Sequence, residues 1–199
     1  MPGPHYAISE MLIVVAAIWS AASCTPRRLW LAAIGSIIFG LAAAIGVYRF
    51  GTGQIAELGG FHKDFSQTGG AIAMALMSAQ LLFASTLVKR FSYGPIIVGG
   101  LIIATIIVAL LVSWSATWLF IGWLSLAILA AAFITDKAFV RRLYLTAIVS
   151  IFLINLLLVR RSPDLGPDLS WHLFHGLIAI WLIGMIYVYK DSAAQNMTS

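Results

Sequence analysis

The chain of 199 residues has little charge and a single cysteine. Only 10% of its residues are charged, whereas 61% are Ala, Val, Ile, Leu, Met, Phe, Trp, Tyr or Cys. Soluble domains average about 25% charged residues, so the polar residues here cannot cover a water-exposed surface. Because Cys24 stands alone, an internal disulfide and a metal site of several thiolates are excluded. The composition therefore predicts an integral membrane protein and excludes disordered and disulfide-rich classes.

The excess of basic residues does not indicate a nucleic-acid-binding protein. The formal net charge is +5, but Lys and Arg occur mostly in pairs between apolar runs rather than in one patch. Such pairs are typical of the loops that orient membrane helices. We expect no nucleic-acid partner, and we expect the lipid bilayer to be the main partner of this chain.

Seven apolar runs are candidates to cross a bilayer, whose hydrocarbon core of about 30 Å needs roughly 20 helical residues. They are Tyr6 to Ala22, Leu29 to Tyr48, Phe65 to Val88, Pro95 to Trp114, Thr117 to Thr135, Phe139 to Val159 and Trp171 to Tyr189. We predict an all-α membrane bundle of seven transmembrane helices. It forms one domain over residues 1–190, followed by a short cytoplasmic tail over residues 191–199. No basic segment precedes the first run, so no cleavable signal is expected.

The loops at the two ends of such a bundle differ in charge. Loops one, three and five with the C-terminal tail carry eight Lys and Arg against two acids, and the opposite side carries four against five. By the positive-inside rule, the N-terminus lies outside and the C-terminus lies in the cytoplasm. In a bacterium, the membrane would be the cytoplasmic (inner) membrane.

Ionisable residues gather on the predicted outer face. Glu10, Asp64 and Asp168 lie at comparable depth near the starts of the first, third and seventh helices. Ionisable groups at the membrane boundary are costly unless they pair, bind a metal or face water, so their convergence predicts a functional site. All four histidines fall on the same face: His5, His62, His172 and His175.

The seventh helix carries the clearest pattern. If it is helical from Asp168, then Asp168, His172 and His175 at positions i, i+4 and i+7 share one face. Imidazole and carboxylate are ligands of zinc and of non-haem iron, and His62, Asp64 or Glu10 could add another. Alternatively, Asp168 or Ser170 caps the helix, and the histidines lie in the membrane interface.

Other polar residues have simpler interpretations. Asp64 or Ser66 could cap the third helix. Arg49 could extend to the lipid headgroups, or pair with Glu10 or Glu57.

The segment Ser170-Trp-His-Leu-Phe-His-Gly-Leu177, in a chain of seven spans with an acid in the first, resembles the last helix of the alkaline ceramidases. These proteins belong to the CREST superfamily of seven-helix membrane hydrolases, which also includes the adiponectin-receptor-like proteins. The segment Gly46-Val-Tyr-Arg-Phe-Gly51 resembles the family element at the end of the second helix. The resemblance implies a seven-helix fold and zinc-dependent hydrolysis of a lipid.

Several family positions carry other residues here. Val47 and Gly51 stand where the family has a serine and its first zinc histidine, and Asp168 stands where it has the first histidine of helix 7. His172 matches a family-type ligand. A metal site in this chain would therefore be built from His62, Asp168, His172 and His175.

The leading hypothesis is a metal-dependent hydrolase that acts on an amide or ester bond of a lipid. Zinc, or else iron, would activate a water and polarise the scissile carbonyl, while Glu10 or Asp64 moves protons. A haem-binding electron carrier is a second possibility, with His62 and either His172 or His175 as axial ligands. A third is a non-catalytic receptor-like or partner subunit, in which these residues form only a polar network.

Overall fold

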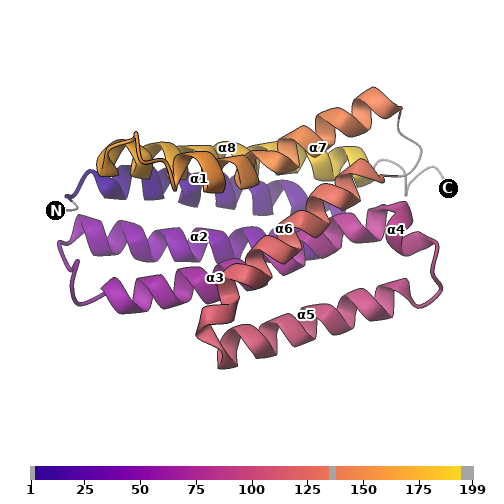
Figure 1. The fold of residues 1–199 in the computed structure, drawn as a ribbon, viewed down its shortest axis with the longest axis horizontal. Helices are drawn as coiled ribbons and strands as arrows, with labels where there is room; N and C mark the ends of the chain where they lie inside the picture. The colour runs from indigo at the N-terminus through magenta and orange to yellow at the C-terminus, as the bar shows by residue number, and fades with distance from the viewer. Residues whose placement is uncertain (1–2, 135–137, 194–199) are drawn as a thin grey trace.

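The computed structural model describes residues 3–134 and 138–193, which form an elongated bundle of helices (Figure 1). Within these ranges the chain has no β-strand, and Ser85 and Ile134 form an isolated antiparallel bridge. The predicted all-α class is therefore confirmed. The helices, with η1 and η2 of the 3-10 type and η3 a π-helix, are α1 (Tyr6–Cys24), η1 (Thr25–Arg27), α2 (Trp30–Gly51), α3 (Gly59–Ala84), α4 (Thr86–Lys89), α5 (Gly94–Leu111), η2 (Ser113–Ser115), α6 (Ala116–Ala132), α7 (Phe139–Ile154), η3 (Asn155–Val159) and α8 (Pro167–Ala193).

Six helical segments of the described chain are long and apolar enough to cross a membrane: Tyr6–Arg27, Trp30–Gly51, Gly59–Ala84, Gly94–Leu111, Phe139–Val159 and Pro167–Ser192. The remaining predicted span corresponds to α6, which is apolar but shorter. These helices indicate an integral membrane protein, because their outward faces carry large exposed apolar side chains such as Ile103 and Leu110 of α5. The predicted end of the fifth span at Thr135 and residues 194–199 of the tail lie outside the described residues.

Two helices begin several residues before their apolar runs. α3 starts at Gly59 rather than Phe65, and α8 starts at Pro167 rather than Trp171. Hydropathy locates the part of a helix that lies in hydrocarbon, whereas the backbone can stay helical through a polar first turn. Neither Asp64 nor Ser66 therefore caps α3, and Asp64 is an exposed residue inside the helix.

Six helices form a closed ring. α1 packs against α2, α2 against α3, α3 against α6, α6 against α7, α7 against α8, and α8 against α1. α5 packs outside this ring, chiefly against α3 (Figure 1). Close packing within the ring depends on small residues, since a Cβ atom on Gly40 of α2 would lie 2.9 Å from the Cβ atom of Ala17 of α1.

The ring is solidly filled around Met74, Met77, Leu124 and Trp181, which are fully buried. The hydroxyl of Tyr189 donates to the backbone oxygen of Met77 at 3.0 Å. α1, α3 and α8 all begin at the end of the bundle opposite to the one at which α8 ends (Figure 1). The cavities described next lie towards that end.

Candidate functional site

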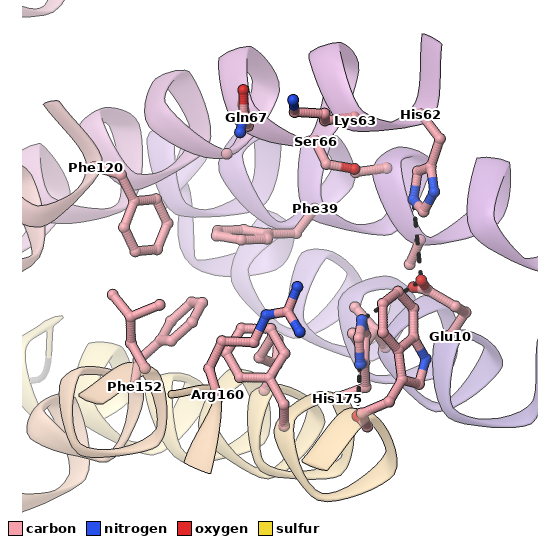
Figure 2. Close-up of a pocket in the computed structure, with 18 of the residues that line it drawn as sticks. Glu10, Phe39, His62, Lys63, Ser66, Gln67, Phe120, Phe152, Arg160 and His175 are labelled. Atoms are coloured by element: carbon pink, nitrogen blue, oxygen red, sulfur yellow. Dashed lines mark hydrogen bonds and ion pairs between the residues drawn. The ribbon is translucent and has the colours of Figure 1, made fainter. Parts of the chain in front are cut away.

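A cavity of about 500 Å³, the main cavity, lies inside the ring. It is lined by residues of α1, α2, α3, α6, α7, η3 and α8. One part of its wall is aromatic, with Phe39, Phe120 and Phe152, and another part is polar (Figure 2). An apolar cavity with a few convergent polar groups is the usual form of a small-molecule site.

The polar part of the wall is the carboxylate–imidazole cluster, formed by Glu10 of α1, His62 of α3 and His175 of α8 (Figure 2). The Oε1 atom of Glu10 lies 3.5 Å from Nε2 of His175 and 3.9 Å from Nε2 of His62. All three residues are buried, with exposed fractions of 3%, 7% and 8% for Glu10, His62 and His175. Three helices far apart in the sequence thus bring one carboxylate and two imidazoles to one point.

Small and aromatic neighbours position this cluster. A Cβ atom on Gly46 would lie 2.6 Å from Oε1 of Glu10, so the carboxylate occupies space that only glycine leaves open. The ring of Trp171 stacks on the ring of His175, with centroids 4.2 Å apart. The ring of Phe50 meets the ring of His62 edge-on at 6.3 Å.

Hydrogen bonds fix the proton on each imidazole. Nδ1 of His175 lies 2.7 Å from the backbone oxygen of Trp171, which only accepts, so Nδ1 must carry the proton and donate. Nη1 of Arg49 donates to Nδ1 of His62 at 3.4 Å, so the proton of neutral His62 lies on Nε2. Arg49 is itself held, because its Nε atom donates to the backbone oxygen of Ile55 at 2.9 Å. Arg49 therefore orients an imidazole of the cluster.

The predicted shared face of the last helix is present, and it faces α1. The hydroxyl of Tyr6 donates to Oδ1 of Asp168. Nδ1 of His172 lies 3.1 Å from the hydroxyl oxygen of Ser9. Of the three residues on this face, only His175 lines the main cavity.

The structure thus brings together three of the six predicted site residues: Glu10, His62 and His175. Asp64 is exposed and does not line the main cavity, and neither do Asp168 and His172.

By their contacts, the four predicted metal ligands divide into two pairs. Asp168 and His172 are engaged by Tyr6 and Ser9 of α1, whereas His62 and His175 lie at the main cavity. In the described ranges, no group of three or more His, Cys, Asp and Glu side chains is arranged to hold a metal ion. We therefore derive no chemical step through a metal.

A second cavity of about 400 Å³, the end cavity, adjoins the main cavity. Both cavities are lined by Arg49, Arg160 and Trp171. The end cavity is also lined by Ser162, Leu165 and Pro167 from the segment between η3 and α8, so it lies at the end of the bundle.

Sequence reasoning missed Arg160, because its position depends on how η3 ends, and it missed the contacts of Ser9. A signal for Ser9 exists, since Tyr6, Ser9 and Glu10 follow helical spacing along α1 and so can match the three polar residues of α8.

No protein-family model, curated protein or solved structure matches the chain. The resemblance to the alkaline ceramidases stays a prediction from short sequence segments. The geometry of the two cavities is therefore the main evidence for a function.

Proposed function

We propose that this protein is a membrane-embedded hydrolase that cleaves an amide or ester bond of a lipid. The single observation that carries the proposal is the carboxylate–imidazole cluster at the wall of an aromatic cavity. The cavity volume of about 500 Å³ suits an acyl chain. The cluster supplies the acid and base groups that hydrolysis of an acyl bond requires. The resemblance of Ser170 to Leu177 to the alkaline ceramidases adds support for an amide.

The proton arrangement of the cluster supports acid and base roles for its members. Because Nδ1 of His175 donates to the backbone, the lone pair of Nε2 faces Oε1 of Glu10 at 3.5 Å. Two lone pairs at this distance repel each other unless one of the two groups binds a proton. Glu10 and His175 therefore share one proton, and one group of the pair can give it while the other accepts.

In the proposed reaction, the shared proton starts on Glu10. The Nε2 atom of His175 accepts a proton from a water molecule as the water oxygen bonds to the acyl carbon. The carbonyl π-bond breaks, and the Nε2–H group of His62 donates to the resulting oxyanion. Glu10 then gives its proton to the leaving nitrogen or oxygen, the bond from that atom to the acyl carbon breaks, and the carbonyl π-bond forms again. The products are a fatty acid and an amine or alcohol, and the proton on His175 returns to Glu10.

The proposed placement in the membrane follows from the charges of the loops. In this proposal α6 crosses the membrane as the fifth of seven spans, the N-terminus lies outside and the C-terminus lies in the cytoplasm. The cavities then lie in the outer half of the membrane, and in a bacterium this is the cytoplasmic membrane. A lipid of the outer leaflet could reach them without crossing the bilayer.

The test measures fatty acid release by mass spectrometry, with purified protein in non-ionic detergent and acyl lipids that carry amide or ester bonds. We expect release by the parent and a loss of at least about 10²-fold in Glu10→Gln, since acid–base groups typically contribute that much. Glu57→Gln is the matched control, because Glu57 is an exposed acid outside both cavities.

Two results would contradict the proposal. One is no release from any lipid of the panel by folded parent protein. The other is equal release by the parent and Glu10→Gln. Elemental analysis and an absorption spectrum of the same sample test the metal-free mechanism, because stoichiometric zinc or iron, or a haem Soret band, would overturn it.

A further inference from the structure

The end cavity and the adjoining wall of the main cavity carry an excess of positive charge. The charged residues that line the main cavity are Glu10 and three bases, Arg49, Lys63 and Arg160. Among the residues that the structure describes, the end cavity is lined by Arg49 and Arg160 and by no acid. Both cavities therefore favour a ligand with negative charge.

The two arginines lack a carboxylate partner within the described part of the chain. No Asp or Glu oxygen there lies within 4.0 Å of either guanidinium group. Arg49 contacts His62 and the backbone of Ile55, and Arg160 lies over the rings of Trp171 and Phe174, at 5.8 and 5.5 Å from their centroids. Arg49 is half-buried and Arg160 is exposed, so both guanidinium groups are accessible to a negatively charged ligand.

The order of features along the bundle matches an acyl lipid. The end cavity lies at the end of the bundle, and the carboxylate–imidazole cluster and the aromatic wall belong to the main cavity beside it. Figure 2 shows Arg160 reaching into the main cavity, between Phe152 and the cluster residue His175 in this view. A lipid with its head group where the two cavities meet, against Arg49 and Arg160, would place its acyl bond near the cluster and its chain against the aromatic rings.

We propose that the end cavity binds the anionic head group of the lipid, a phosphate or carboxylate held by Arg49 and Arg160. Guanidinium groups form paired, charge-assisted hydrogen bonds with such oxygens. This inference rests on the proposed function, and it narrows the substrate to acyl lipids with an anionic head group. Trp171 contributes to the walls of both cavities, so the head group and the acyl bond lie on one continuous path.

The test measures binding without hydrolysis, by native mass spectrometry of Glu10→Gln protein in non-ionic detergent. The probes share one acyl chain: monooleoylglycerol phosphate, oleate and uncharged monooleoylglycerol. We expect the two anionic probes to bind about tenfold or more tightly than the uncharged probe, because one charge-assisted hydrogen bond is worth about that factor. Added salt should weaken this preference.

Variants of Arg160 and of its neighbour in the sequence, Arg161, make the test specific. In the Glu10→Gln background, Arg160→Gln should lose most of the preference for anionic probes, whereas Arg160→Lys should keep part of it. Arg161→Gln is the matched control, because Arg161 is exposed and lines neither cavity. A thermal denaturation curve for each variant confirms that it is folded.

Three outcomes would overturn the inference. The first is equal binding of charged and uncharged probes. The second is loss of the preference for anionic probes in Arg161→Gln as well as in Arg160→Gln. The third is full displacement of the lipids by millimolar inorganic phosphate. The last result would mean a site for a free anion. If anionic probes bind selectively while the parent hydrolyses nothing, the inference stands and the proposed function fails. If the parent hydrolyses uncharged lipids and anionic probes do not bind selectively, the proposed function stands and this inference fails.

Discussion

The carboxylate of Glu10 lies directly against Gly46. A Cβ atom on Gly46 would be 2.6 Å from both Cδ and Oε1 of Glu10, closer than any ordinary van der Waals contact. The position of the carboxylate between two imidazoles therefore depends on a missing side chain in the neighbouring helix. Cδ and Oε1 are at the end of the flexible Glu10 side chain. A methyl group at position 46 of α2 therefore fits only if this carboxylate moves.

Gly46→Ala is therefore expected to damage the cluster and spare the fold. Alanine favours helix over glycine by up to about 1 kcal/mol, which offsets part of the crowding. We expect lipid hydrolysis to fall about 10²-fold with a small change in melting temperature, since a displaced acid–base group loses its alignment. Gly51→Ala is the control, because nothing lies within 4 Å of a Cβ atom there. Equal activity of these two variants would contradict the assigned role of Glu10.

His172 is expected to stabilise the α1–α8 contact and to have no part in the reaction. Its Nδ1 atom contacts Ser9 at 3.1 Å, and Ser9 in turn donates to the backbone oxygen of Tyr6 at 3.1 Å. Hydrogen bonds between membrane helices average about 0.6 kcal/mol, so His172→Ala should lower the melting temperature slightly. Hydrolysis should stay within a few-fold of the parent.

Two measurements separate this role from the metal-ligand role that the sequence suggests. A double-mutant cycle of Ser9→Ala and His172→Ala should give a coupling energy near 0.6 kcal/mol. If His172→Ala instead abolishes hydrolysis and removes a bound metal, His172 is a ligand and the assignment here is wrong.

The sequence predicts the helices well because hydrocarbon thickness sets their length and water-facing loops interrupt the apolar runs. It also predicts that Asp168, His172 and His175 share a face, since that depends only on the helical repeat. It does not show which of them reaches a cavity. That depends on the rotation of α8 relative to α1, which places Ser9 opposite His172 and Glu10 opposite His175.

The other half of the site depends on segments with weak sequence signals. His62 reaches the cluster because α3 begins at Gly59, ahead of the apolar run, and so carries this residue on a buried face. Arg160 lines both cavities because the π-helix η3 ends just before it. Neither the start of α3 nor the π-helical turn follows from hydropathy, so these placements needed the structure.

Thr105 is expected to connect α5 to the ring. Its hydroxyl oxygen accepts a hydrogen bond of 2.8 Å from Nε1 of Trp123 in α6, and both side chains are buried. Thr105→Val keeps the shape but leaves the indole N–H without an acceptor, which costs about 1 to 3 kcal/mol in a buried site. Thr105→Ser keeps the oxygen and should be less destabilising. Melting temperatures in detergent compare the two, and a larger loss in Thr105→Ser would show that packing of the methyl group matters more than the hydrogen bond.

The proposed orientation in the membrane is tested with reporter fusions in bacteria. Alkaline phosphatase is active only outside the cytoplasm, so its fusion after Gly53, between α2 and α3, should be active. Green fluorescent protein folds in the cytoplasm, so its fusion to the C-terminus should fluoresce. The reason is the charge difference of the loops, with pairs such as Arg27 and Arg28 retained on the cytoplasmic side. The opposite pattern would invert the bundle, place both cavities in the inner leaflet, and make a cytoplasmic-leaflet lipid the proposed substrate.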